Sequence, residues 1–125
     1  MLRTVVNLPH LTFGGMSQAV RTDRTVRISG QVALGPDGLV GDGDIRAQSE
    51  QVFRNLGELL EAAGSSVDDI VKLTCFLVNA DDFTGYSEVK SLQFAGDPPA
   101  SSTVVVAELL DPRFLLEVEA EAVIR

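Results

Sequence analysis

The chain has 125 residues, of which 45% are hydrophobic and 22% charged, a composition typical of one globular domain over residues 1–125. Its only cysteine, Cys75, excludes an intrachain disulfide, and residues 1–8 lack the basic start and apolar run of a signal peptide. We therefore expect a soluble, cytoplasmic protein with no membrane span. The formal net charge of −8 argues against a nucleic-acid-binding protein, which usually carries a basic surface.

The first part of the chain predicts three strands, over residues 2–7, 17–22 and 25–33. The third alternates apolar and polar residues with a period of two, which predicts that Ser29 and Gln31 share a face with Arg27. A turn follows at residues 35–38, and glycines continue to Gly43. This segment lacks the lysine and the strand-turn-helix pattern of a phosphate-binding loop, so we interpret it as a mobile connection.

The rest of the chain predicts two helices and three further strands. Apolar residues at three- and four-residue spacing predict an amphipathic helix over residues 44–63, ended by Gly64 in the left-handed conformation. A second helix is expected to begin with Asp81 or Asp82 as its N-cap, and residues 96–99, Gly-Asp-Pro-Pro, break it. The strands are expected over residues 71–79, 102–109 and 114–124.

The element order is therefore βββ-α-β-α-ββ, which is typical of an α+β domain with its helices on one face of a sheet. The opposite face and the edges of such a sheet need cover. For a small domain with strands near both ends of the sequence, association of subunits is the natural cover.

Several short motifs are spread over nearly the whole chain. They occupy residues 28–32 (ISGQV), 60–64 (LEAAG), 67–72 (VDDIVK), 82–83 (DF), 99–100 (PA) and 116–120 (LEVEA). In this order and at this spacing they resemble the Rid (reactive intermediate deaminase, or YjgF) family. The resemblance implies a chorismate-mutase-like fold with a mixed sheet, a homotrimer, and a small-molecule cleft at each subunit interface. Archetypal members hydrolyse 2-imino or enamino acids to 2-oxo acids and ammonia, without a metal or an organic cofactor.

The resemblance also implies which positions line the cleft, and at four of them this chain departs from the archetype. Ser101 replaces an arginine that grips the substrate carboxylate, Thr103 a cysteine, Met16 a tyrosine and Ser87 an asparagine. Each charge-assisted hydrogen bond of an arginine–carboxylate pair contributes about 1.5–3 kcal/mol, so its loss weakens carboxylate binding roughly tenfold to more than a hundredfold. Either the ligand lacks that carboxylate, or another cation binds it, or the chemistry is lost.

The matching positions that remain are Ser29, Gly30 and Glu117. Hydrolysis of a C=N bond needs a water that is held and partly deprotonated, and a partly buried carboxylate with a raised pKa can do this. Glu117 is therefore the candidate catalytic residue, although Glu119 and Glu121 make a row with it that could simply be solvated or pair with a neighbouring chain. Ser29 and Gly30 could position a substrate or mark a strand bend. No histidine–aspartate pattern surrounds Ser29, which argues against a triad nucleophile.

Arg27 lies two residues before Ser29 on the same predicted face, and it could supply the positive charge that Ser101 does not. The alternative is an ion pair between Arg27 and a C-terminal glutamate of a neighbouring chain. Replacing Arg27 with alanine is expected to weaken the binding of an anionic ligand while leaving a trimer intact.

Two other reactive residue types are given structural interpretations. His10, the only histidine, has no cysteine or carboxylate pattern near it, so it predicts a surface loop and no metal site. Cys75 lies mid-strand between Leu73 and Leu77, which indicates a small core residue and not a nucleophile.

The leading hypothesis is a Rid-type enzyme that adds water to a small reactive imine or enamine at a trimer interface, with an altered substrate preference. The alternative is a non-catalytic small-molecule-binding or regulatory trimer. Ribonuclease or translation-inhibitor activity, with which the family has also been labelled, is disfavoured. An acidic chain with one histidine has few groups for acid–base catalysis on RNA or for holding its phosphates.

Overall fold

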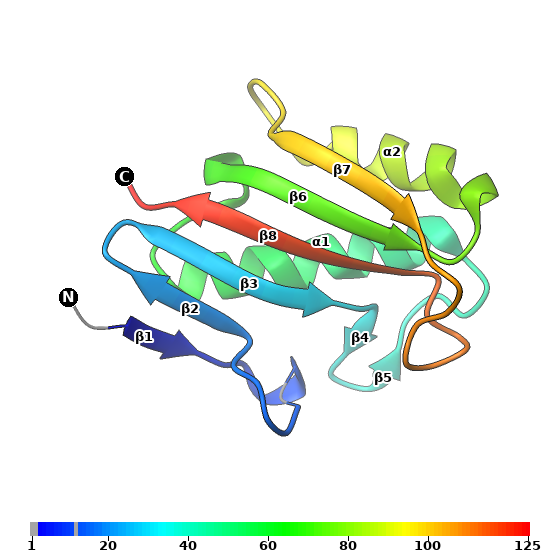
Figure 1. Ribbon diagram of the computed structural model, residues 1–125, viewed down its shortest axis with the longest axis horizontal. Coiled ribbons are helices and arrows are strands. Elements are labelled where there is room, and N and C mark those ends of the chain that lie inside the picture. Colours follow the sequence, from blue (N-terminus) through cyan, green and yellow to red (C-terminus); the bar gives the residue numbers. More distant parts are fainter. Residues whose placement is uncertain (1–2, 12) are drawn as a thin grey trace.

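The computed structural model describes residues 3–11 and 13–125, which form a six-stranded sheet with two helices on one of its faces (Figure 1). The strands lie in the order β1-β2-β3-β8-β6-β7. Their bounds are β1 Arg3–Val6, β2 Ala19–Thr22, β3 Thr25–Gln31, β6 Ile70–Leu77, β7 Ala100–Val105 and β8 Leu116–Val123. Only the β6–β7 pair in this sheet is parallel, so the predicted mixed sheet and the α+β class are confirmed. Neither helix in the described ranges is long and apolar enough to cross a membrane.

The longer helix, α1 (Ile45–Ala62), forms where the amphipathic pattern predicts it. Asp44 caps its start, because the Asp44 Oδ1 accepts hydrogen bonds from the N–H groups of Arg46 and Ala47 at 3.0 and 3.1 Å. Gly64 follows its end with a φ of +87°, the left-handed conformation expected there. The apolar stripe is buried against the sheet and includes Val52, Phe53, Leu56, Leu59 and Leu60.

The shorter helix, α2 (Phe83–Ser91), follows a 3-10 turn at Ala80–Asp82 and buries Tyr86 and Val89. The prediction that Asp81 or Asp82 is its N-cap residue is confirmed for Asp82. The Asn79 side chain accepts from the Asp81 N–H at 2.9 Å and so caps the preceding turn, whereas Asp82 makes no side-chain capping bond.

The last strand of the sequence lies at the centre of the sheet, because β8 pairs with β3 on one side and β6 on the other. Its residues alternate strictly. Leu116, Val118, Ala120 and Ala122 are buried on the helix side, while Glu117, Glu119 and Glu121 belong to the opposite face. Figure 1 shows that face uncovered by either helix, so the row of carboxylates lies on the open side of the sheet.

A β-bulge interrupts the pairing of β3 with β8. Ile28 pairs with Ala120 and Gln31 with Val118, so Ser29 and Gly30 together lie opposite Glu119. Cross-strand partners share a face, and the extra residue therefore turns Gln31 toward the core, where its side chain is 2% exposed. The prediction that Gln31 shares the face of Arg27 is wrong for this reason.

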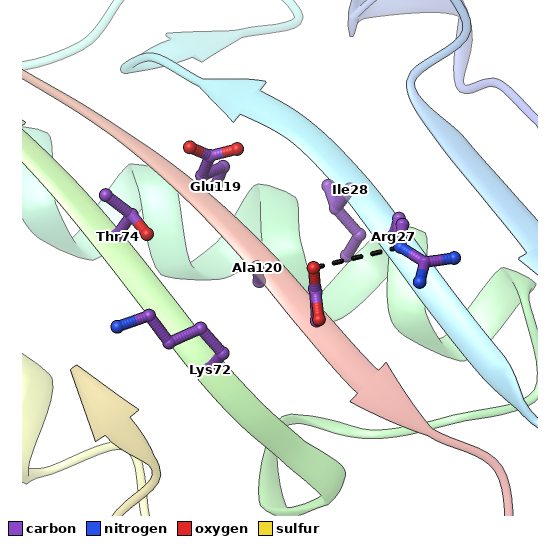
Figure 2. A pocket seen from close by; sticks show the side chains of 7 residues that line it. Arg27, Ile28, Lys72, Thr74, Glu119 and Ala120 are labelled. Carbon is purple, nitrogen blue, oxygen red and sulfur yellow. Dashed lines mark ion pairs between the residues drawn. The ribbon is translucent and has the colours of Figure 1, made fainter. Parts of the chain in front are cut away.

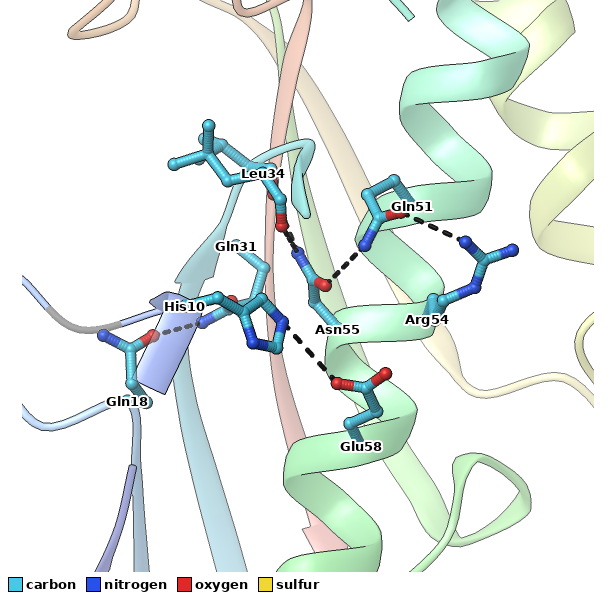
Figure 3. Close-up of polar contacts among 9 residues, drawn as sticks. His10, Gln18, Gln31, Leu34, Gln51, Arg54, Asn55 and Glu58 are labelled. Atoms are coloured by element: carbon cyan, nitrogen blue, oxygen red, sulfur yellow. Dashed lines mark hydrogen bonds and ion pairs between the residues drawn. The ribbon is translucent and has the colours of Figure 1, made fainter. Parts of the chain in front are cut away.

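A buried polar cluster joins α1 to the end of β3 (Figure 3). The Asn55 Nδ2 donates to the carbonyls of Val32 and Leu34 at 3.1 and 3.0 Å, and the Asn55 Oδ1 accepts from Gln51 Nε2 at 2.8 Å. One turn earlier, Gln48 accepts from the N–H of Leu115 at 2.9 Å. These side chains satisfy backbone groups where β3 ends and β8 begins, beside the bulge.

Two details of the connections differ from the predicted elements. The strand expected over residues 102–109 begins at Ala100 and ends at Val105, because the chain leaves the sheet edge there. A small hairpin of β4 (Leu34–Gly35) and β5 (Gly38–Leu39) closes the turn that the sequence predicted at residues 35–38.

Candidate functional site

Glu117 and Gly30 are in contact across the two central strands. The Glu117 side chain lies over the bulge, and a Cβ atom added to Gly30 would lie 2.7 Å from Glu117 Cδ and 2.8 Å from Glu117 Cγ. A side chain at position 30 would therefore displace the end of the Glu117 side chain, so glycine leaves room for the carboxylate in this position. The bulge thus determines where the Glu117 side chain can lie.

The carboxylate of Glu117 is half-buried, and no other described residue donates a hydrogen bond to it or forms an ion pair with it. Burial raises the pKa of Glu117 above the ordinary glutamate value, and the nearby charge of Glu119 raises it further. A carboxylate with a raised pKa is a stronger base than an ordinary one, and its oxygens are free to bind a water or a ligand.

Ser29 already has partners in the fold. Its Oγ donates to the carbonyl of Ser17 at 2.8 Å, and its N–H donates to the carbonyl of Gln18 at 2.9 Å. These bonds tie the bulge to the segment that precedes β2, where the Met16 side chain is 51% exposed. The hydroxyl proton of Ser29 is therefore engaged, while its oxygen can still accept a hydrogen bond. We call Met16, Ser29, Gly30 and Glu117 the Glu117 group.

The other predicted cleft residues lie elsewhere, and we call Ser87, Ser101 and Thr103 the Ser101 group. On the edge strand β7, Ser101 pairs with Leu73 and Thr103 pairs with Cys75. Both partners are fully buried on the helix side, so Ser101 and Thr103 face that side as well. Ser87 is partly buried on α2, the helix nearest to β7.

The two groups lie on opposite faces of the sheet within one copy of the chain. Glu117 pairs with Phe76 on β6, and Phe76 pairs with Val104 on β7. The strand β6 and the thickness of the sheet therefore separate Glu117 from Thr103. One protomer places Gly30 in contact with Glu117 at β3 and β8 and places Ser101 and Thr103 on β7, but it does not bring the two groups together.

Arg27 lies on the open face and has a partner within its own chain (Figure 2). It is the register partner of Glu121 on β8, and the Arg27 Nε lies 3.7 Å from the Glu121 Oε1. The sequence suggested a C-terminal glutamate of a neighbouring chain as the partner. The antiparallel register places one directly opposite Arg27 in the same chain. A pocket of about 250 Å³ opens beside this pair, lined by Arg27, Ile28, Lys72, Thr74, Glu119, Ala120 and Glu121.

Lys90 is a cation at the Ser101 group that the sequence analysis did not single out. It lies in the last turn of α2, and its Nζ donates to the Ser101 Oγ at 3.3 Å. The same ammonium lies 5.6 Å from the centre of the Tyr86 ring, one helical turn earlier. The four-residue spacing of Tyr86 and Lys90 was visible in the sequence, but their position beside β7 depends on how α2 packs.

The two remaining candidates, Cys75 and His10, lie in environments that indicate structural roles. Cys75 is fully buried, and burial raises the pKa of its thiol to about 12, as suits a core residue. His10 lies in a 3-10 turn, with its Nε2 3.6 Å from the Glu58 Oε2 on α1. Among residues 3–11 and 13–125, no three histidine, cysteine or acidic side chains gather in a way that could hold a metal ion.

Comparisons with known proteins place this chain among close relatives. Residues 10–124 match the family model described as Endoribonuclease L-PSP. The chain is 42% identical over 112 residues to the 2-iminobutanoate/2-iminopropanoate deaminase of Mus musculus, covering 88% of this chain and 82% of that protein. Two crystal structures superpose closely. YyfA of Yersinia pestis, of the conserved Rid protein family, has a TM-score of 0.91 at 32% identity, covering 98% of this chain and 100% of that one. TdcF of E. coli, with bound serine, has a TM-score of 0.89 at 29% identity, covering 98% and 99%.

Proposed function

The chain belongs to the Rid family, and we propose that it hydrolyses a reactive imine or enamine in a cleft formed between two subunits of a homotrimer. The observation that carries this proposal is the half-buried Glu117 carboxylate, which has a raised pKa, packs over Gly30 and has no partner among the described residues. Perturbed carboxylates without a protein partner cluster at functional sites, which makes Glu117 a candidate.

Glu117 is proposed to act as the base for addition of water to the C=N bond. It accepts a proton as the water oxygen bonds to the imine carbon, and the electron pair of the C=N bond moves to nitrogen, which is protonated. Glu117 passes the proton it accepted to this nitrogen, which gives the carbinolamine. The hydroxyl proton of the carbinolamine then transfers to the amino nitrogen as the C–N bond breaks and ammonia leaves. The overall reaction consumes one imine and one water and yields one carbonyl compound and one ammonia. An enamine enters the same sequence after protonation on carbon.

The need for two subunits is inferred from the positions of the two groups. Because the Glu117 group and the Ser101 group lie on opposite faces of one protomer, a cleft lined by both requires the Glu117 group of one copy and the Ser101 group of another. Exposed apolar side chains support association, since Met16, Val104, Val105 and Leu110 are 51%, 45%, 56% and 98% exposed. In this arrangement Met16, Ser87 and Thr103 shape the pocket, and Ser101 alters its preference among substrates.

The test is ammonia release from freshly generated 2-iminobutanoate and 2-iminopropanoate and from a neutral imine of similar size. We expect turnover of at least one, with kcat/KM lowered by about a hundredfold or more in Glu117→Gln, the loss typical of a removed acid–base group. Glu119→Gln is the matched control, because Glu119 lies two residues along the same strand face and is exposed. It is expected to retain activity within a few-fold. Ammonia release at the uncatalysed rate for every imine, or full activity in Glu117→Gln, would contradict the proposal.

Ligand binding without turnover is a second candidate, favoured by the serine bound to the similar TdcF structure. It predicts measurable binding of small amino or oxo acids together with no acceleration of imine hydrolysis by the wild-type protein. Cleavage of RNA, suggested by the description of the family model, is supported less. The chain is acidic, and its one histidine contacts Glu58 on the helix side, away from Glu117.

A further inference from the structure

The β-bulge beside Glu117 is held by the side chain of the residue that follows it. The Gln31 Nε2 donates to the carbonyl of Ser29 at 3.0 Å and to the Gln18 Oε1 at 3.2 Å. Figure 3 shows the two glutamine side chains joined in this way. Both hydrogens of the Gln31 amide are thereby used, one on a residue of the bulge and one on the segment that leads into β2.

Gln18 is itself fixed by hydrogen bonds through its backbone. Its carbonyl accepts from the N–H of Ser29 at 2.9 Å, and its N–H donates to the Asn7 Oδ1 at 2.8 Å. Gln18 and Gln31 are only 1% and 2% exposed, so water does not compete for the bond between their side chains. The two glutamines therefore hold both the N–H and the carbonyl of Ser29.

The bulge decides which residue faces Glu117. Ile28 lies opposite Ala120, so a regular antiparallel ladder would place Gln31 directly opposite Glu117, with its amide within reach of the carboxylate. The extra residue instead places Gly30 against the Glu117 side chain and turns Gln31 into the core. The amide that could have donated to the carboxylate holds the bulge instead.

We propose that Gln31 is a positioning residue, whose buried hydrogen bonds hold the bulge and thereby keep the Glu117 carboxylate over Gly30 and free of a protein donor. This inference rests on the proposed function, in which Glu117 activates the water. Gln31 lies on the core side of the sheet and acts on the reaction only through the backbone of the bulge. Its removal should therefore affect the chemical step more than substrate binding.

Gln31→Met tests this role, because methionine keeps the length of the side chain but cannot donate. With freshly generated 2-iminobutanoate, kcat is expected to fall by about tenfold or more while KM stays within about threefold. Gln51→Met is the matched control, since Gln51 is 4% exposed and its Nε2 donates to the Asn55 Oδ1 at 2.8 Å, a buried amide bond of the same kind on α1. It is expected to lower Tm by a similar amount and to leave kcat and KM within about threefold.

A carboxyl NMR titration of Glu117 reports on its environment without any turnover. Glu117→Gln assigns the signal in protein labelled with ¹³C-glutamate. Burial is the main cause of the raised pKa of Glu117, so a carboxylate released into solvent should titrate nearer the ordinary glutamate pKa. We expect this lowering of the pKa in Gln31→Met and not in Gln51→Met. Gln18→Met removes one of the two Gln31 bonds and is expected to give a smaller change in the same direction.

The two measurements separate this inference from the proposed function. If ammonia release depends on Glu117 but Gln31→Met changes neither kcat nor the pKa of Glu117, the inference is wrong and the proposed function stands. If no imine is turned over but Gln31→Met alone lowers that pKa, the enzyme proposal fails and the positioning role remains. Equal effects of Gln31→Met and Gln51→Met on kcat and on the pKa overturn the inference, because they indicate a general loss of structure. If Gln31→Met does not fold, Gln18→Met decides, and an unchanged pKa and kcat in that variant overturn the inference.

Discussion

Glu117 is a half-buried carboxylate to which no described residue donates a hydrogen bond or pairs a cation. Its position depends on Gly30, since a larger residue there would displace the end of the Glu117 side chain. The same burial that makes Glu117 a better base also penalises its charged form in the folded state. Function and stability are therefore opposed at this residue.

That opposition gives a prediction for stability as a function of pH. The pKa of Glu117 is raised in the folded state, so the folded protein binds this proton more tightly than the unfolded chain. Glu117 therefore subtracts stability as the pH rises through the ordinary glutamate pKa of about 4.3, and the full penalty remains above its folded pKa. Glu117→Gln is expected to raise Tm by a few degrees at pH 7, with the difference shrinking toward pH 4. A lower Tm for the variant at neutral pH would contradict this.

Among the elements, the end of β3 has the most constrained geometry. The bulge at Ser29 and Gly30 resets the alternation of the strand, and the next residues are fixed by side chains of α1. Asn55 is fully buried and donates to the Leu34 carbonyl and to the Val32 carbonyl, which also accepts from the Leu34 N–H at 2.8 Å. Helix α1 thus supports the site indirectly by fixing the backbone beside it.

Asn55→Ala is predicted to destabilise the protein by about 1–3 kcal/mol, because the Leu34 carbonyl would lose its donor, while the Val32 carbonyl would keep only the Leu34 N–H. Chemical denaturation of matched samples measures this difference. Ser91→Ala is a suitable control, since the Ser91 hydroxyl donates to the Ser87 carbonyl at an exposed position. Its effect is expected to stay within about 0.5 kcal/mol. Equal stabilities for the two variants would show that the Asn55 cluster is not important for the fold.

At the scale of the whole molecule, one face of the sheet is covered by neither helix within a single protomer (Figure 1). It carries Glu117, Glu119 and Glu121 from β8 and Val104 from the edge strand β7. In the homotrimer proposed above, this face and the β7 edge would meet other copies.

Light scattering after gel filtration is expected to give three times the 13.4 kDa chain mass. Val104→Asp should shift the protein toward smaller species, because it introduces a charge next to Phe76 on the face proposed to be covered. It should also remove imine hydrolysis along with the shared cleft. Leu92→Asp is the control, since Leu92 is 83% exposed just beyond α2 on the helix side. A monomeric wild type with full activity would exclude the inter-subunit cleft.

Local patterns in the sequence were sufficient to predict much of the fold. The three- and four-residue spacing of apolar residues predicted α1, Gly64 marked its end, and the alternation of residues 116–123 predicted which side chains of β8 are buried. These features depend on neighbours within a few residues, so the sequence alone determines them. The motifs that resemble the Rid family likewise indicated the mixed α+β sheet, and the structure and the comparisons confirmed it.

The tertiary structure decided which residues from distant parts of the sequence lie close together. The central place of β8, the bulge that turns Gln31 inward, and the opposite faces of Glu117 and Ser101 all follow from register and strand order between segments far apart in sequence. Lys90 has no motif that marks it, and it reaches Ser101 only because α2 packs beside the parallel strand β7. Periodicity reports which side of an element faces inward, whereas contacts between elements depend on long-range pairing that no local pattern encodes.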